Sequence, residues 1–457
     1  MYEIVTIDNV ARLEGHASVA IYLDKNGGVD RAEYLATEPS RAFDVILQGK
    51  HASEVPTLAA RICGICYTAH NICACKALED AWGTEIPETA RKIRELLLFT
   101  NTLASHALHF VFLAGPGLFI EGSNTLSDFQ EKYPELFESG VKLRMIGQEI
   151  SEIIAGRKVH TTISAPGGVL GALDLEKQDN IIQLLDSTSQ FMEVLADYSL
   201  RLLSEKKEYL LTWGKIETHF MALKQSKRLE LYDAPTELLK KNGDIEILSP
   251  ASKILLRITE GEKEYSYVRH PFLTDLGQEE GQFRVGPLAR IQNVKWDFPG
   301  FREFKSVFGN RTQSTMGYHM ARVPEMFACI HAMKDIIESG LDEDIKVKAQ
   351  PKEGIGVAVV EAPRGLLLHQ YETDGEGIVR KARVIAPTTF HQGSIERSTF
   401  EAAKHVHRSE KGEWSDEDKI KVEQAIRAYD PCMSCAGATQ LRTIKRPKVG
   451  GYDDQNA

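Results

Sequence analysis

The sequence has a shortage of basic residues relative to acidic ones, with 55 Lys and Arg against 65 Asp and Glu and a formal net charge of −10. Proteins that bind nucleic acids normally carry a basic patch or stripe, so this balance argues against such a partner. Cysteine is also scarce, with seven in 457 residues. An odd number without a secretory signal does not suit a disulfide framework, so we expect ligands or buried thiols.

Leader and membrane-spanning patterns are lacking as well. Residues 1–5 have neither the basic region nor the apolar run of a signal peptide. The longest apolar stretch, 96–120, is interrupted by Thr100, Asn101, His106 and His109, which favours a buried core helix over a membrane span. Hydrophobic residues make up 42% and charged residues 26%, as in ordinary globular proteins. We therefore expect a soluble, cytoplasmic protein without a membrane span.

The apolar periodicity predicts a mainly helical protein with small β-sheets, an α+β class built around a central helix bundle. The expected helices are 88–114, 178–204, 325–339 (after Pro324) and 416–428, the last opened by a capping box of Ser415 and Asp418.

Strands are expected in three separate parts of the chain. These are residues 1–50, 245–300 and 350–390. The third part reads as strands 357–361, 366–371 and 378–385, with a turn at Thr373-Asp374-Gly375. Because no repeat and no convincing linker interrupts the chain, we expect one large domain over 1–457.

Four of the cysteines form two C-x-x-C pairs, Cys63 with Cys66 and Cys432 with Cys435, and 365 residues separate the pairs. Thiolates are soft ligands that suit zinc, iron–sulfur clusters or soft transition metals. Spacing alone leaves open a structural zinc, although zinc modules usually have some 12–20 residues between pairs. A redox disulfide is a second alternative, weakened by the lack of an adjacent βαβ pattern.

The other three cysteines, Cys73, Cys75 and Cys329, fall inside helical patterns and are expected to be buried thiols. If the two ends of the chain converge, the C-x-x-C pairs form one four-sulfur site. Such a site requires the first and last parts of the sequence to meet in the fold.

The flanks of the two pairs resemble signatures of the large subunit of nickel–iron hydrogenases. Arg61-Ile62-Cys63-Gly64-Ile65-Cys66-Tyr67-Thr68-Ala69-His70 is similar to R-x-C-G-x-C-x-x-x-H, and Asp430-Pro431-Cys432-Met433-Ser434-Cys435 is similar to D-P-C-x-x-C. Further segments agree in the family's order: Arg12-Leu13-Glu14-Gly15-His16, His106 with His109 and Phe110, His160 before Pro166-Gly167-Gly168, Val285-Gly286-Pro287-Leu288-Ala289-Arg290, and Glu361-Ala362-Pro363-Arg364-Gly365. The resemblance covers essentially the whole chain and is closest to the cytoplasmic multimeric branch, which includes F420-reducing, methyl-viologen-reducing and NAD(P)-linked enzymes.

This resemblance implies a nickel–iron centre held by the four cysteines. Cys63 and Cys432 would be terminal nickel ligands. Cys66 and Cys435 would bridge nickel to an iron that carries cyanide and carbonyl ligands. The implied reaction is the reversible heterolytic cleavage of dihydrogen to protons and electrons.

Four more residues acquire roles from the same resemblance. His70 matches an imidazole that hydrogen-bonds a bridging sulfur. Glu14 matches a carboxylate that relays protons from a terminal thiolate. Arg364 matches a guanidinium over the open face of the metals, and Asp430 matches its carboxylate partner. Each type of residue also occurs in plain structural roles, as a core histidine or a buried ion pair.

Several positions depart from the family pattern. Asp44 stands where a magnesium ligand is usually Glu, and Ala438 stands where the family usually has a His or Arg, the His being another magnesium ligand. Gly117 and His391 replace a frequent Asp and Asn. Residues 439–457 correspond to an extension that is normally removed in the family.

The resemblance also implies partners, because no further cysteine group in the sequence can bind an iron–sulfur cluster. We expect a small subunit with iron–sulfur clusters, together with further electron-transfer subunits of flavin or heterodisulfide-reductase type. The departures leave an alternative function, in which a hydrogenase-fold subunit with an altered metal site is a scaffold in an electron-transfer complex and does not split dihydrogen.

Overall fold

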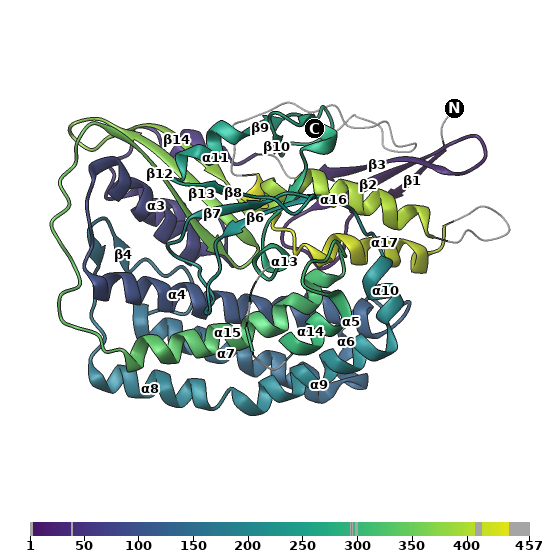
Figure 1. The fold of residues 1–457 in the computed structure, drawn as a ribbon, viewed down its shortest axis with the longest axis horizontal. Coiled ribbons are helices and arrows are strands. Elements are labelled where there is room, and N and C mark those ends of the chain that lie inside the picture. Colours follow the sequence, from purple (N-terminus) through teal and green to yellow (C-terminus); the bar gives the residue numbers. More distant parts are fainter. Residues whose placement is uncertain are drawn as a thin grey trace.

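Long helices and small sheets form two layers in the computed structural model (Figure 1). The structure describes residues 3–37, 40–292, 294, 296–297, 300–406 and 414–437. One layer consists of the long helices, which run side by side, and the other holds the sheets together with α3, α16 and α17 (Figure 1). The predicted class, mainly α with small β-sheets, is confirmed.

The helices of the first half of the chain include the longest bundle members. They are α1 (Phe43–Ile46), α2 (Val55–Ala59), α3 (Tyr67–Trp82), α4 (Glu88–Ala107), the π-helix η1 (Leu108–Ala114), α5 (Gly115–Phe119), α6 (Leu126–Lys132), α7 (Pro134–Ala155), α8 (Leu175–Asp186), α9 (Ser189–Glu205) and α10 (Lys207–Thr212). Helices α4, α7, α9 and α15 pack against one another in the helical layer.

The helices of the second half are mostly shorter. They are α11 (Ser252–Arg257), α12 (Gly277–Glu280), α13 (Pro287–Arg290), α14 (Phe301–Phe308), α15 (Gly317–Glu338), α16 (Pro387–Lys404), α17 (Asp416–Ala428) and α18 (Met433–Ala436). Helix α17 begins at the predicted capping box, in which Asp418 N–H donates to the Ser415 hydroxyl and Ser415 N–H to the Asp418 carboxylate.

Strands gather in separate small sheets. They are β1 (Glu3–Ile7), β2 (Ala17–Leu23), β3 (Val29–Ala36), β4 (Ser164–Ala165), β5 (Gly168–Val169), β6 (His219–Leu223), β7 (Thr236–Leu239), β8 (Ile245–Leu248), β9 (Ile258–Gly261), β10 (His270–Leu273), β11 (Phe283–Arg284), β12 (Gly354–Ala362), β13 (Gly365–Thr373) and β14 (Val379–Ile385). Strand orders are β1-β2-β3, β12-β13-β14 and β11-β6-β7-β8, all antiparallel except the β11–β6 pair. The predicted meander of 357–385 is confirmed, with its turn closed by Asp374 and Ile378.

The central helical run extends through α4, η1 and α5. Within the part of the chain that the structure describes, Glu88–Phe119 is the helical run long and apolar enough to cross a membrane, and 78% of its most apolar window is buried inside the fold. Such burial is typical of a core helix, as the interrupting polar residues predicted. The sequence did not reveal the π-helix at Leu108–Ala114, a distortion that often lies at functional sites.

Two predicted helix boundaries were wrong. The helix expected over 178–204 is divided into α8 and α9 at Ser187 and Thr188, whose hydroxyls donate to the carbonyls of Leu184 and Leu185 and compete with the helical backbone. Helix α15 begins at Gly317 and not after Pro324. It continues through the proline because burial of most of its residues outweighs one lost backbone hydrogen bond.

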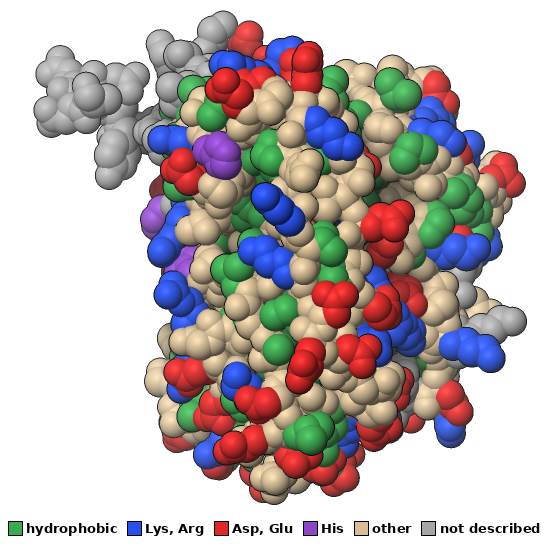
Figure 2. Space-filling model, turned by 90° about the vertical axis from the view of Figure 1, so that its left-hand side faces the viewer, with side chains coloured by type: hydrophobic (Ala, Val, Ile, Leu, Met, Phe, Trp, Pro, Cys, Tyr) green, Lys and Arg blue, Asp and Glu red, His purple; other side chains and the backbone are tan. Residues whose placement is uncertain are grey.

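A large contiguous cluster of buried apolar side chains, with members from Ile7 to Ala436, joins the two layers, and smaller clusters lie among the strands. On the face shown in Figure 2, acidic and basic side chains are intermixed and hydrophobic ones lie in small separate groups. This pattern is that of an ordinary solvated surface. The cysteines of both C-x-x-C pairs are buried beneath the surface, in the interior.

Candidate metal centre

The N-terminal C-x-x-C pair lies in the tight connection between α2 and α3. Cys66 is the N-cap of α3, and the backbone N–H groups of Ile65 and Cys66 point at the Cys63 sulfur, at 3.2 and 3.4 Å. Amide donors and the positive end of a helix favour a thiolate. The local backbone therefore offers two hydrogen-bond donors to the Cys63 sulfur.

The C-terminal pair follows α17 after a sharp change of direction. Asp430 has a left-handed backbone conformation, with φ of 55°, and Cys432 is the N-cap of the short helix α18. Cys432 N–H donates to the Thr388 hydroxyl on α16 at 2.9 Å. This contact fixes the position of the Cys432 backbone relative to α16.

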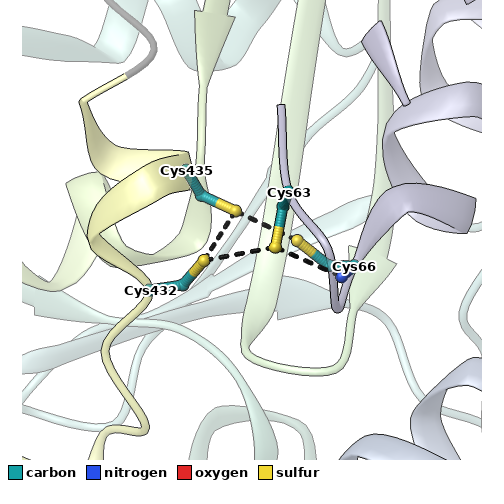
Figure 3. A group of neighbouring side chains, drawn as sticks. All are labelled: Cys63, Cys66, Cys432 and Cys435. Atoms are coloured by element: carbon teal, nitrogen blue, oxygen red, sulfur yellow. Dashed lines mark hydrogen bonds between the residues drawn. The ribbon is translucent and has the colours of Figure 1, made fainter. Parts of the chain in front are cut away.

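The four predicted cysteines meet in one buried cluster (Figure 3). The Sγ atoms of Cys63 and Cys432 are 3.4 Å apart, those of Cys66 and Cys435 3.0 Å, and those of Cys432 and Cys435 2.9 Å. All four sulfurs lie within 4.8 Å of one another, and each residue is at most 2% exposed. This donor set fits a soft transition-metal centre that bridges both ends of the chain.

Burial and the closeness of the four sulfurs to one another shift the pKa values of three of these thiols. Burial raises the pKa of Cys432 and Cys435, whereas hydrogen bonds from the neighbouring thiols lower the pKa of Cys66. Four thiolates this close repel one another, so protons or a cation must share the space between them. Metal binding therefore competes with protons at this site.

Glu14 lies directly against the C-terminal pair. Its Oε2 is 3.0 Å from the Cys432 sulfur and accepts the Ser434 N–H at 3.0 Å. The Glu14 backbone pairs with Pro431 and Met433 on the same segment. The segment before β2 thus brings a carboxylate to a sulfur more than 400 residues later in the chain.

Arg364 and Asp430 form a buried ion pair beside the sulfurs. Arg364 Nη2 is 2.8 Å from Asp430 Oδ1, and its Nε donates to the Asp430 carbonyl at 2.6 Å. Burial opposes both charges and raises the pKa of Asp430, yet Asp430 and the nearby sulfurs keep the pKa of Arg364 well above its ordinary value. Arg364 Nη1 and Asp430 Oδ2 are buried without a protein partner among the described residues, so each retains one free hydrogen-bonding atom.

The Val285–Arg290 motif supports the Arg364 loop from behind. A Cβ on Gly286, whose φ is 87°, would lie 2.3 Å from the Arg364 carbonyl oxygen, so only glycine permits this approach. Arg290 donates to the carbonyls of Ala362 and Pro363, and it pairs with Glu325 and Glu361. Gly286 thus allows the Arg364 loop to approach closely, and Arg290 holds that loop in place.

His70 lies one helical turn after Cys66 on α3. Its Nδ1 is 3.0 Å from His369 Nε2, and His369 Nδ1 is 2.6 Å from the Tyr371 hydroxyl. All three side chains are fully buried, and His70 Nε2 has no protein partner among the described residues. His369 and Tyr371, on β13, were missed by sequence reasoning because alternate strand positions carry no motif of their own.

Asp44 is buried at the start of α1, where its Oδ1 accepts the Val384 N–H at 3.2 Å. Burial raises the pKa of this carboxyl to about 7. Arg41 N–H donates to the Gly437 carbonyl at 2.8 Å, so the Asp44 segment adjoins the end of the C-terminal motif. Ala438 and the extension 439–457 lie outside the described residues.

Arg41 was also missed by sequence reasoning. Its guanidinium donates to the carbonyls of both Ile62 and Ser434, so one side chain ties the two C-x-x-C segments together. An isolated arginine in a polar stretch gives no sequence signal for this role.

Two of the departures from the family pattern have a structural explanation. At Gly117 a Cβ would lie 1.7 Å from Gln424 Nε2, so the side chain of Gln424 takes the space that an aspartate there would need. His391 Nε2 is 3.1 Å from the Arg364 carbonyl oxygen. His391 therefore belongs to the packing around Arg364, whereas Gly117 belongs to the packing of α5 against α17.

Comparison with known proteins agrees with this geometry. Residues 41–118 and 224–437 match the family described as nickel-dependent hydrogenase, and residues 4–38 match one described as HoxL-like. One subunit of the F420-non-reducing hydrogenase vhu of Methanocaldococcus jannaschii is 35% identical over 418 residues, which cover 88% of this chain and 99% of the relative. The NAD-reducing hydrogenase HoxS subunit beta of Cupriavidus necator is 30% identical, with 94% of each chain covered.

A solved structure also superimposes on the fold. An NAD+-reducing [NiFe]-hydrogenase in the H2-reduced state has a TM-score of 0.87 and 30% identity, with 95% of this chain and 99% of that chain covered. Identity at this level over nearly the whole length shows common descent and not only a shared architecture. The chain therefore belongs to the nickel-dependent hydrogenase family as a large, catalytic subunit, an oxidoreductase type whose family activity is the heterolytic cleavage of dihydrogen.

Proposed function

We propose that Cys63, Cys66, Cys432 and Cys435 hold a nickel–iron centre, with Cys63 and Cys432 as terminal nickel ligands and Cys66 and Cys435 as bridges to an iron with cyanide and carbonyl ligands. The observation that carries this proposal is the convergence of four buried sulfurs within 4.8 Å. When bound, such a centre supplies the heterolytic cleavage of dihydrogen. The soft, anionic donor set is what this chemistry requires.

Glu14 is proposed to take the proton from Cys432 and pass it outward. A carboxylate oxygen 3.0 Å from a sulfur is within the range for direct proton transfer. The Ser434 N–H holds that same oxygen in place. Because backbone pairing with Pro431 and Met433 also fixes Glu14, the transfer distance does not depend on a mobile side chain alone.

Arg364 and Asp430 are proposed to shape the open face of the centre. Their ion pair fixes the guanidinium, while the free Nη1 of Arg364 offers one donor for a group at the sulfurs. A buried cation beside four sulfurs also lowers the energy of the anionic thiolates. His70 is proposed to donate a hydrogen bond to a bridging sulfur from its unpartnered Nε2.

Asp44 is proposed as an oxygen ligand of a magnesium ion near the end of the C-terminal motif. A buried carboxyl whose pKa is raised to about 7 gains from a neighbouring cation, and hard carboxylate oxygens suit magnesium. Ala438 offers no side-chain ligand, so the other ligands would have to be backbone carbonyls or water.

Electrons are proposed to leave through a small iron–sulfur subunit, then through further electron-transfer subunits of flavin or heterodisulfide-reductase type. The three remaining thiols support this, since Cys73, Cys75 and Cys329 are separately buried and burial raises the pKa of Cys73 to about 12. The relatives named above are themselves subunits of hydrogenases. All seven cysteines are free, which suits a reducing, cytoplasmic location.

The decisive experiment compares two cysteine variants of the purified complex. We expect wild type and Cys329→Ser to contain nickel and to show infrared bands of iron-bound cyanide and carbonyl, and Cys432→Ser to lose nickel and dihydrogen-dependent dye reduction. Cys329 is the matched control because it is equally buried but outside the cluster. Absence of both nickel and the bands from the wild-type complex would refute the proposed centre and would favour a scaffold role.

A further inference from the structure

A buried chain of three side chains leads away from the cluster on the side of Cys66. It runs from His70 on α3 to His369 and Tyr371 on β13, with donor–acceptor distances of 3.0 and 2.6 Å. None of the three is exposed to solvent. The proposed roles of the site residues leave the last two members unused.

The direction of the hydrogen bonds follows from the phenol. A hydroxyl carries one proton, and among the described residues His369 Nδ1 is the acceptor within reach of the Tyr371 hydroxyl. A buried O–H left without an acceptor bears the full cost of its lost hydration, so the proton of Tyr371 points at His369. Both groups stay neutral, because burial raises the pKa of Tyr371 and lowers the pKa of His369.

The same rule then orders the two imidazoles. A neutral imidazole has one donor and one acceptor nitrogen. Since His369 Nδ1 accepts from Tyr371, its Nε2 carries the proton and donates to His70 Nδ1. His70 Nδ1 is then an acceptor, and the proton of His70 is on Nε2, the buried nitrogen that has no partner among the described residues.

His70 lies at the end of α3 that adjoins the cluster, four residues after the N-cap Cys66. Residues four apart lie on the same face of a helix, and the His70 N–H donates to the Cys66 carbonyl at 3.3 Å. We infer that Tyr371 is a positioning residue, which acts through His369 to fix His70 as an Nε2–H hydrogen-bond donor toward the Cys66 sulfur. This inference rests on the nickel–iron centre proposed above.

The test is infrared spectroscopy of the purified complex, loaded with metal, with Tyr371→Phe. Phenylalanine keeps the ring but removes the O–H that fixes the tautomer of His369. Both tautomers of His70 then become populated, and in one of them Nε2 has no proton to donate. With less hydrogen bonding the sulfur donates more charge to iron, which back-donates into carbonyl, and we expect the carbonyl band to move to lower wavenumber. Tyr232→Phe is the control, since it removes another buried hydroxyl, the one that contacts Arg94.

A rescue separates this effect from general loosening of the core. In the background of Tyr371→Phe, the change His369→Gln places an amide N–H where His369 Nε2 was, and it donates to His70 without help from the phenol. We expect the carbonyl band to return to the wild-type position. If Tyr371→Phe gives no folded complex, His369→Gln should keep the wild-type band while His369→Leu shifts it.

The inference would be overturned if the carbonyl band of metal-loaded Tyr371→Phe stayed at the wild-type position. It would also be overturned if the band stayed there in both His369→Gln and His369→Leu. A shift of equal size in Tyr232→Phe would overturn it too, because the effect would then be unspecific. A wild-type complex with neither nickel nor iron-bound carbonyl and cyanide bands refutes the proposed centre and, with it, this inference. Nickel and bands with no response to Tyr371 refute the inference alone.

Discussion

At the scale of single residues, three non-glycine positions near the site have left-handed backbone conformations. Arg12, Ala42 and Asp430 have φ values of 58°, 51° and 55°. Each stands two residues before a site residue, namely Glu14, Asp44 and Cys432. Such conformations cost about 1–2 kcal/mol each and persist where the surrounding structure imposes them. At this site they turn the chain so that a side chain enters the interior.

Glu14 is the residue whose replacement should separate proton transfer from metal binding. We expect Glu14→Gln to keep nickel and iron but to lower dihydrogen-dependent dye reduction by about 100-fold or more, the usual range for a lost general base. Glutamine retains an oxygen that accepts the Ser434 N–H, so the segment should keep its place. Dye reduction and metal content measured on the same sample check this. Wild-type turnover in this variant would exclude Glu14 from the proton route.

Individual site residues were predictable to different degrees. Cys63, Cys66, Cys432 and Cys435 could be identified because a spacing of three residues and their flanks are local properties of the sequence. Arg41, Thr388 and His369 could not, because each acquires its contact from a segment far along the chain, and Tyr371 joins the site only through His369. Long-range partners of single polar residues leave no pattern in one sequence.

At the scale of elements, a buried ionic network connects α4, α13, α15 and β12. Arg290 pairs with Glu325 at 2.6 Å and with Glu361 at 2.8 Å, and His106 Nε2 is 2.9 Å from Glu325. Burial disfavours the Glu325 carboxylate, yet Arg290 lowers its pKa to about 2. Glu325, the partner of His106, therefore stays anionic. Arg290 and Arg322 lie nearby, and their positive charges disfavour protonation of His106.

Gly286 is the point where one of these elements touches the site. We expect Gly286→Ala to lower dihydrogen turnover by about 100-fold, because a Cβ 2.3 Å from the Arg364 carbonyl must displace that loop, and a shift of about 1 Å at a catalytic group has such an effect. Gly375→Ala is the control, since its Cβ would meet nothing within 4 Å. Equal turnover in the two variants would contradict the supporting role of the Val285–Arg290 motif.

His106 should make stability depend on pH. Burial lowers its pKa to about 4, from an ordinary value near 6.5, so the unfolded chain binds this proton first. The contribution of His106 to the free energy of unfolding should therefore be greatest above pH 6.5. It should fall by about 1.4 kcal/mol per pH unit between about pH 6.5 and pH 4. Denaturant unfolding between pH 7 and 4 should show a shallower decline in His106→Gln. Parallel pH profiles for the two proteins would contradict this assignment.

At the scale of the whole molecule, the first and last segments of the chain build one site. Glu14 and Arg41 from the beginning, and Cys432 and Ser434 from the end, contact each other across the junction. A metal held by both C-x-x-C pairs binds the native arrangement and not the unfolded chain. Metal binding and closure of the fold are therefore linked.

Removal of the metals should weaken this junction. We expect the complex stripped by a chelator to unfold at a lower temperature than the loaded complex, with a difference of about 4 kcal/mol if the loaded sample holds metal at about a thousand times its dissociation constant. Calorimetry of both samples measures it. Cys432→Ser should show no further decrease on stripping, and an unchanged midpoint in wild type would argue against a shared centre.

Sequence alone determined the class of the fold, the capping box at Ser415, the β12–β14 meander and the two C-x-x-C pairs whose four sulfurs converge, because each depends on neighbours a few residues apart. The single domain over 1–457 stays a prediction. Tertiary structure decided where α8 and α9 separate, why α15 continues through Pro324, and which groups surround the sulfurs. Those outcomes depend on burial and on partners hundreds of residues away, which only the folded chain brings together.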